Sequence, residues 1–114
     1  MTKNNNHPVV GKSINLNGGV KEDIGKADWS LVDLEIVQRM ANVLSYGAKK
    51  YSRHNYDKVE PYKYLAAVMR HITKWQDGEL IDPETNEHHL AHAMTNLHIL
   101  QRLEKNDIRY NKDD

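Results

Sequence analysis

The chain has 114 residues, and its 16 basic and 16 acidic side chains cancel to a formal net charge of zero. This length is typical of one domain, and the balanced charge argues against a general electrostatic hold on extended nucleic acid or an anionic membrane. Cysteine is absent, which excludes disulfides and thiolate metal sites, and no stretch approaches the roughly 18 apolar residues of a membrane span.

Residues 1–28 are rich in Asn, Gly and Lys and carry few apolar side chains. They bury too little apolar surface to fold alone, so we expect an extended N-terminal arm. Val10, Ile14 and Leu16 can form one short strand or an arm that docks on a partner subunit, and Gly18 and Gly19 mark a turn. The arm also lacks the apolar run of a secretory signal. With the missing cysteines, this predicts a cytoplasmic protein.

Residues 29–105 show apolar side chains at helical spacing in three stretches. We expect helices near 30–48, 60–78 and 85–104, the first capped by Ser30 and the second opened by Pro61. Residues 106–114 form a polar tail. The predicted fold is all-α, a small three-helix bundle with an extended arm. Three amphipathic helices make a thin core, so we expect a symmetric homo-oligomer, dimer or larger, to complete it, with the arm or the first helix at the interface.

The start of the third predicted helix gathers unusual side chains for a core. Glu79 and Asp82 lie three residues apart before Pro83, and His89, His92 and Asn96 follow on one helical face. Carboxylates are suitable ligands for Mg²⁺ or Mn²⁺, and imidazoles for softer metals or general-base work. The alternative is a solvated helix start with unrelated histidines. We predict Glu79 and Asp82 as metal ligands, with His89 catalytic and His92 and Asn96 binding ligand.

A second group, just past the first predicted helix, combines cations with aromatic rings. Such side chains can pair with phosphate oxygens and stack on a base or sugar. Cations that only complement the helix dipole are the alternative, and for Lys49 alone this is favoured. The predicted ligand-binding residues here are Lys50, Tyr51, Arg53, Asn55 and Tyr56.

The middle helix adds Arg70 and His71. Arg70 can bind a phosphate bidentately or form a salt bridge. His71 shares a stripe with Tyr64, Val68 and Trp75. A histidine in such company is more often a hydrogen-bonded core residue than a metal ligand or a base. Both residues are kept as candidates for ligand binding.

Four strings in order resemble one known family, the N-terminal domain of phage dATP/dGTP diphosphohydrolases. They are residues 26–32, residues 46–51 with Asn55-Tyr56, Arg70-His71 with Trp75, and residues 78–96. The resemblance implies an all-helical protein similar to MazG-like nucleotide pyrophosphohydrolases, which hold Mg²⁺ with carboxylates. Glu79 and Asp82 match that role by motif. The Glu-x-x-Glu pair expected on an earlier helix is missing, because the first helix offers only Asp33 and Glu35.

Two functions follow from this resemblance. One is a metal-dependent hydrolase that cleaves a purine deoxynucleoside triphosphate to the monophosphate and pyrophosphate, in the host cytoplasm if the protein is phage-encoded. The other is a non-catalytic protein that sequesters a nucleotide, for example a host signalling nucleotide. Both have a purine nucleotide as partner. Turnover of dATP or dGTP with Mg²⁺ separates them.

Overall fold

The computed structural model describes residues 12–14, 18–22 and 25–106. The chain divides into two compact units, with the boundary between Asp33 and Leu34. In the first unit, β1 (Lys12–Ile14) pairs antiparallel with β2 (Val20–Glu22), so that Ile14 lies opposite Val20. Gly18 has a φ of 76°, a left-handed value that glycine adopts without strain. The described part of the predicted arm therefore contains one short antiparallel strand pair.

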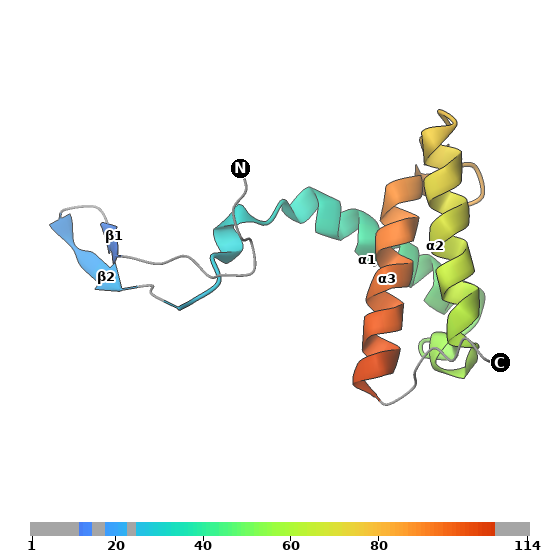
Figure 1. Ribbon diagram of the computed structural model, residues 1–114, viewed down its shortest axis with the longest axis horizontal. Coiled ribbons are helices and arrows are strands. Elements are labelled where there is room, and N and C mark those ends of the chain that lie inside the picture. The colour runs from blue at the N-terminus through green and yellow to red at the C-terminus, as the bar shows by residue number, and fades with distance from the viewer. Residues whose placement is uncertain (1–11, 15–17, 23–24, 107–114) are drawn as a thin grey trace. The chain divides into compact units, whose positions relative to one another are not determined.

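The second unit contains α1 (Leu34–Lys50), α2 (Pro61–Gln76) and α3 (His89–Lys105). A short 3-10 turn, η3 (Asn55–Lys58), lies between α1 and α2. In Figure 1, α2 and α3 run side by side in opposite directions, and α1 crosses them. The prediction of three helices is confirmed, and two short strand pairs accompany them.

The first helix begins later than expected. Residues Trp29–Leu31 form a separate 3-10 turn, η2, capped by Asp28, whose Oδ1 accepts a hydrogen bond from the Ser30 backbone N–H. Val32 then takes an extended conformation, with φ −80° and ψ 129°. An extended residue cannot continue a helical turn. Ser30 is therefore not the N-cap of α1, which starts at Leu34.

The third helix also begins later, because a hairpin occupies its predicted first turn. Strand β3 (Ile81–Asp82) pairs with β4 (Glu87–His88), with Asp82 opposite Glu87. Asn86 has a φ of 60°, which suits a tight turn and is incompatible with a right-handed helix. The His88 ring then caps α3, since its Nδ1 accepts from the Leu90 backbone N–H at 3.0 Å.

Helix α3 supplies most of the core. Its buried side chains are His89, Ala91, His92, Ala93, Thr95, Ile99 and Leu103, whereas α2 buries only Pro61 and Val68, and α1 buries none. Leu103 is fully buried. Small residues at 91 and 93 let neighbouring elements approach α3 closely. The polar residues among them are His89, His92 and Thr95, and each of them makes a hydrogen bond.

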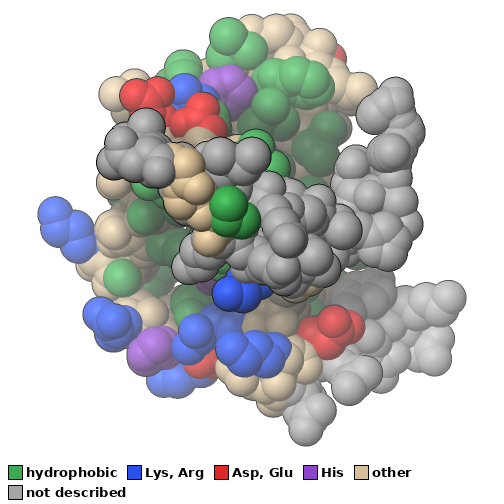
Figure 2. Space-filling model, turned by 90° about the vertical axis from the view of Figure 1, so that its left-hand side faces the viewer, with side chains coloured by type: hydrophobic (Ala, Val, Ile, Leu, Met, Phe, Trp, Pro, Cys, Tyr) green, Lys and Arg blue, Asp and Glu red, His purple; other side chains and the backbone are tan. Residues whose placement is uncertain are grey.

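Many large apolar side chains of the second unit remain at the surface. Figure 2 shows hydrophobic side chains exposed among charged ones on the face that it draws. On α2 they include Leu65, Met69 and Ile72, which are 36%, 62% and 37% exposed. On α1 they include Leu34 and Val37. None of the helices in the described ranges has the length and apolar character needed to cross a membrane.

Candidate functional site

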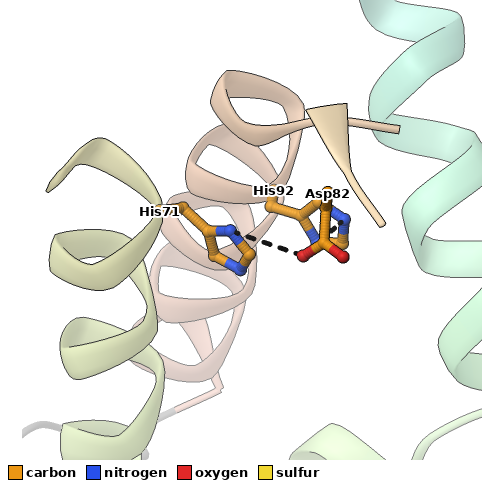
Figure 3. Close-up of side chains that lie close together, drawn as sticks. All are labelled: His71, Asp82 and His92. Atoms are coloured by element: carbon orange, nitrogen blue, oxygen red, sulfur yellow. Dashed lines mark ion pairs between the residues drawn. The ribbon is translucent and has the colours of Figure 1, made fainter. Parts of the chain in front are cut away.

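Three side chains from three elements converge at the hairpin end of the helices: His71 from α2, Asp82 from β3 and His92 from α3 (Figure 3). One nitrogen or oxygen of each lies within 4.8 Å of the others. His71 Nδ1 and His92 Nε2 are each 3.9 Å from Asp82 Oδ2. The two imidazole rings stack, with centroids 4.4 Å apart and planes 10° apart. We call these residues the His-Asp-His triad.

A second row of hydrogen bonds surrounds the triad. His89 lies behind His71, with its Nδ1 2.8 Å from His71 Nδ1, and its Nε2 is 2.8 Å from Glu79 Oε2. Because a carboxylate only accepts, His89 Nε2 carries the proton in this bond. On the other side, Thr85 Oγ1 is 2.6 Å from His92 Nε2. Each triad imidazole is therefore oriented by a neighbour outside the triad.

Burial sets the charge state of the triad. It lowers the pKa of His71 to about 4, helped by the proximity of His92 and His89, and it also lowers the pKa of His92. Burial alone would raise the pKa of the Asp82 carboxyl. The Glu84 and Thr85 backbone N–H groups and the neighbouring imidazoles outweigh it, so the pKa of Asp82 lies below its usual value. At neutral pH the triad is therefore two neutral imidazoles and one carboxylate.

This donor set fits a divalent metal ion. Neutral imidazole nitrogens and a carboxylate oxygen are metal ligands in their binding protonation states. Two ligand atoms bound to one ion at about 2.1 Å can lie up to about 4.2 Å apart, and His71 Nδ1 and His92 Nε2 are each 3.9 Å from Asp82 Oδ2. Both nitrogens also make the contacts to His89 and Thr85, so an ion bound between them would replace these two contacts. Two nitrogens with one oxygen suit Mn²⁺ and the later transition metals better than Mg²⁺, which prefers oxygen and water.

A cavity of about 290 Å³ opens beside the triad, between the three helices and the hairpin. All three triad residues line it. Its other walls are aromatic and amide-bearing, with Tyr46, Tyr51, Tyr56, Tyr64, Asn55 and Asn96 among them. The volume is at the lower end for small-molecule sites. Rings that can stack on a base and amide groups that can bond its edge thus lie beside the His-Asp-His triad, and nucleotide sites use both kinds of group.

The edge of this cavity carries a charged link between α1 and the hairpin. Glu84 Oε2 accepts hydrogen bonds from Lys50 Nζ at 2.8 Å and from the Tyr46 hydroxyl at 2.9 Å. Lys50 also lies 5.4 Å from the centroid of the Tyr51 ring. Hydrogen bonds from Lys50 and Tyr46 lower the pKa of Glu84, and the Glu84 bond raises the pKa of Lys50. Both groups are therefore charged at neutral pH.

The structure brings most of the predicted site residues together. Those that line the cavity are Tyr51, Arg53, Asn55, Tyr56, His71, Asp82, His92 and Asn96. Lys50 does not line the cavity itself but lies at its edge, because it bonds Glu84, which does line it. Arg70 lies instead on a separate surface hollow with Lys74 and Glu79. Glu79 and His89 stand behind the triad, where Glu79 bonds His89 and does not join Asp82.

Some cavity residues were outside the sequence prediction. Helical periodicity predicts a helix start at Thr85, whereas the hairpin brings the Thr85 hydroxyl within 2.6 Å of His92 Nε2. Tyr64 lines the cavity, and burial together with the nearby Asp57 raises its pKa to about 12, so its hydroxyl stays protonated. Tyr64 could have been found from the stripe that it shares with His71, because this spacing puts both residues on the face of α2 that meets α3.

Comparison with known proteins places this chain in a family. The family described as dATP/dGTP diphosphohydrolase, N-terminal, matches residues 17–114. The chain belongs to this family. A dATP/dGTP diphosphohydrolase of Salmonella phage PMBT28 is 39% identical over 79 residues, which are 69% of this chain and 27% of the relative. The family member described here thus spans about a quarter of that relative's length. No solved structure matches this chain.

Proposed function

We propose that the chain is a metal-dependent nucleotide pyrophosphohydrolase domain that acts on purine deoxynucleoside triphosphates. The observation that carries the proposal is the His-Asp-His triad in the wall of a cavity lined by tyrosines and asparagines. Membership of the dATP/dGTP diphosphohydrolase N-terminal family supports the substrate class. The phage relative, which is named for the same activity, supports it as well.

His71, Asp82 and His92 would hold the metal, and of the two ions expected from the sequence their donor set favours Mn²⁺ over Mg²⁺. When bound, a divalent ion neutralises phosphate charge and lowers the pKa of a water molecule. His89 and Glu79 would hold the His71 ring in place before the metal binds, which differs from the direct metal and catalytic roles expected for them from the sequence.

The cavity residues would position the nucleotide. Tyr51 and Tyr56 offer rings on which the purine can stack, and Asn55 and Asn96 offer amide groups for its edge. Arg53 would pair with the phosphate chain. In the reaction, water attacks the α-phosphorus, the bond to the oxygen bridging the α- and β-phosphates breaks, and the water gives up a proton. The products are the deoxynucleoside monophosphate and pyrophosphate.

The test is turnover of dATP and dGTP by the purified chain with Mn²⁺, with Mg²⁺ and with EDTA, followed by chromatography of the products. We expect monophosphate and pyrophosphate with Mn²⁺ and none with EDTA. Asp82→Asn should lower the rate by at least about a hundredfold, because a metal site contributes several kcal/mol to catalysis. Asp77→Asn removes an acid outside the cavity and should keep the wild-type rate.

Tight binding of dATP or dGTP without any product, in the presence of either metal, would contradict hydrolysis. It would favour the alternative predicted from the sequence, a protein that only sequesters a nucleotide. Binding that persists in EDTA would strengthen that outcome, because a sequestering cavity does not depend on the triad holding a metal.

A further inference from the structure

The carboxylate of Glu84 occupies two hydrogen-bond donors at the edge of the cavity. Its Oε2 alone accepts from both Lys50 Nζ and the Tyr46 hydroxyl, at 2.8 and 2.9 Å. Both donors come from α1, one turn apart, and so lie on one face of that helix. An ammonium group and a phenol that converge on one oxygen form a small anion-binding arrangement.

This arrangement adjoins the triad. Tyr46 and Glu84 both line the cavity with Asp82 and His92. Glu84 is two residues from Asp82, and its backbone N–H donates to Asp82 Oδ1 at 2.7 Å. An anionic chain that reaches from the triad along this wall therefore arrives at the place where the Glu84 carboxylate now sits.

We propose that Tyr46 and Lys50 form a subsite for a phosphate group, and that Glu84 fills this subsite as an internal anion until a nucleotide displaces it. The proposal rests on the proposed function and adds a residue, Glu84, that opposes substrate binding. The Glu84 carboxylate takes the position that a phosphate oxygen would occupy between Tyr46 and Lys50. Its carboxylate competes with the substrate for the same two donors.

Because Lys50 and Glu84 are exposed, a phosphate can displace the Glu84 carboxylate with little loss of free energy. The side chains of Lys50 and Glu84 are 45% and 57% exposed, and exposed ion pairs are weak. A triphosphate carries more charge than one carboxylate and brings contacts elsewhere in the cavity. Glu84 can move outward into water, where its charge is solvated.

A second acid in the same hairpin provides a matched control. Glu87 also links the hairpin to α1, since its Oε2 accepts from the Asn42 side-chain amide at 3.0 Å. Glu87 does not line the cavity. Replacing Glu87 by Gln removes the same charge from the same hairpin and leaves Tyr46 and Lys50 occupied by Glu84.

The experiment measures binding of inorganic tripolyphosphate to the full chain by calorimetry in EDTA, so that no metal contributes. Glu84→Gln should bind about fivefold more tightly, which corresponds to loss of one repulsion of about 1 kcal/mol near the surface. The glutamine amide oxygen can still accept from Tyr46 and Lys50, which preserves the link to α1. Glu87→Gln should bind as the wild type does. Lys50→Met should weaken tripolyphosphate binding. The double variant Lys50→Met/Glu84→Gln should bind little more tightly than Lys50→Met alone.

Unchanged or weaker binding by Glu84→Gln would overturn the proposal, because Glu84 would then be a structural link only or a contributor to the ligand site. The outcome is separable from that of the proposed function. A fivefold gain without any dATP or dGTP turnover would leave the phosphate subsite standing and refute hydrolysis. Turnover of dATP or dGTP, with tripolyphosphate binding unchanged in Glu84→Gln, would support hydrolysis and refute the phosphate subsite.

Discussion

Three histidines within 22 residues lie in contact, and their surroundings give them different roles. His71 and His92 stack beside Asp82 and face the cavity. His89 is almost fully buried, at 1% exposure, and contacts His71 on one side and Glu79 on the other. Glu79 therefore fixes the His89 ring, and His89 in turn limits how the His71 ring can rotate.

This arrangement predicts the effect of Glu79→Gln. The glutamine can still accept the hydrogen bond from His89 but carries no charge, so His89 and then His71 are held less firmly. We expect the affinity for Mn²⁺, measured by calorimetry, to fall about tenfold, the lower end of the range for groups behind a metal ligand. Asp77→Asn, at the end of α2, serves as the control and should leave the affinity unchanged. A loss well above a hundredfold would show Glu79 to be a direct ligand, as the sequence first suggested.

At the scale of elements, helical periodicity was sufficient for the three helices and insufficient for the hairpin between two of them. Apolar spacing located α2 within two residues at each end, because Pro61 and Gly78 mark its limits. The segment 81–88 gave no strand pattern, since each strand is two residues long. That hairpin aims Asp82 and Thr85 at His92, so the triad could not be derived from spacing along a helix. The aromatic cluster after α1 was predictable, because its members lie close in sequence.

The hairpin's conformation depends on Asn86, which predicts how substitutions there behave. Its φ of 60° is left-handed, and its backbone N–H donates to the Asp82 carbonyl at 2.8 Å. Asn86→Ala should lower the free energy of unfolding by about 1 kcal/mol, because a side chain with Cβ and no local hydrogen bond disfavours this region. Asn86→Gly should be close to neutral, since glycine adopts it freely. Urea unfolding followed by circular dichroism measures both. Equal stability of the alanine and glycine variants would show that the turn conformation is not limiting.

At the scale of the whole molecule, α1 and α2 carry large apolar side chains that stay exposed among the described residues. Leu65, Met69 and Ile72 follow one stripe of α2 at spacings of four and three, and all are exposed. Helix α1 buries no side chain. A contiguous apolar surface of this kind is typical of a site of association, and a net charge of zero gives little electrostatic protection against it.

We therefore expect the chain to be a homo-oligomer in which the α2 stripe of one copy contacts another copy. Met69 is the most exposed of the three side chains, so Met69→Glu would place a charge inside the contact and should shift the mass from a dimer or larger species to the monomer. Multi-angle light scattering at micromolar concentration measures the change. Lys63→Glu alters the charge of the same helix away from this stripe, and should leave the oligomer intact because it adds no buried charge. Since Met69 does not line the cavity, metal binding by the monomeric Met69→Glu variant would show that the His-Asp-His triad is complete within one chain. A monomeric wild type would refute the contact and leave the α2 stripe as bare surface.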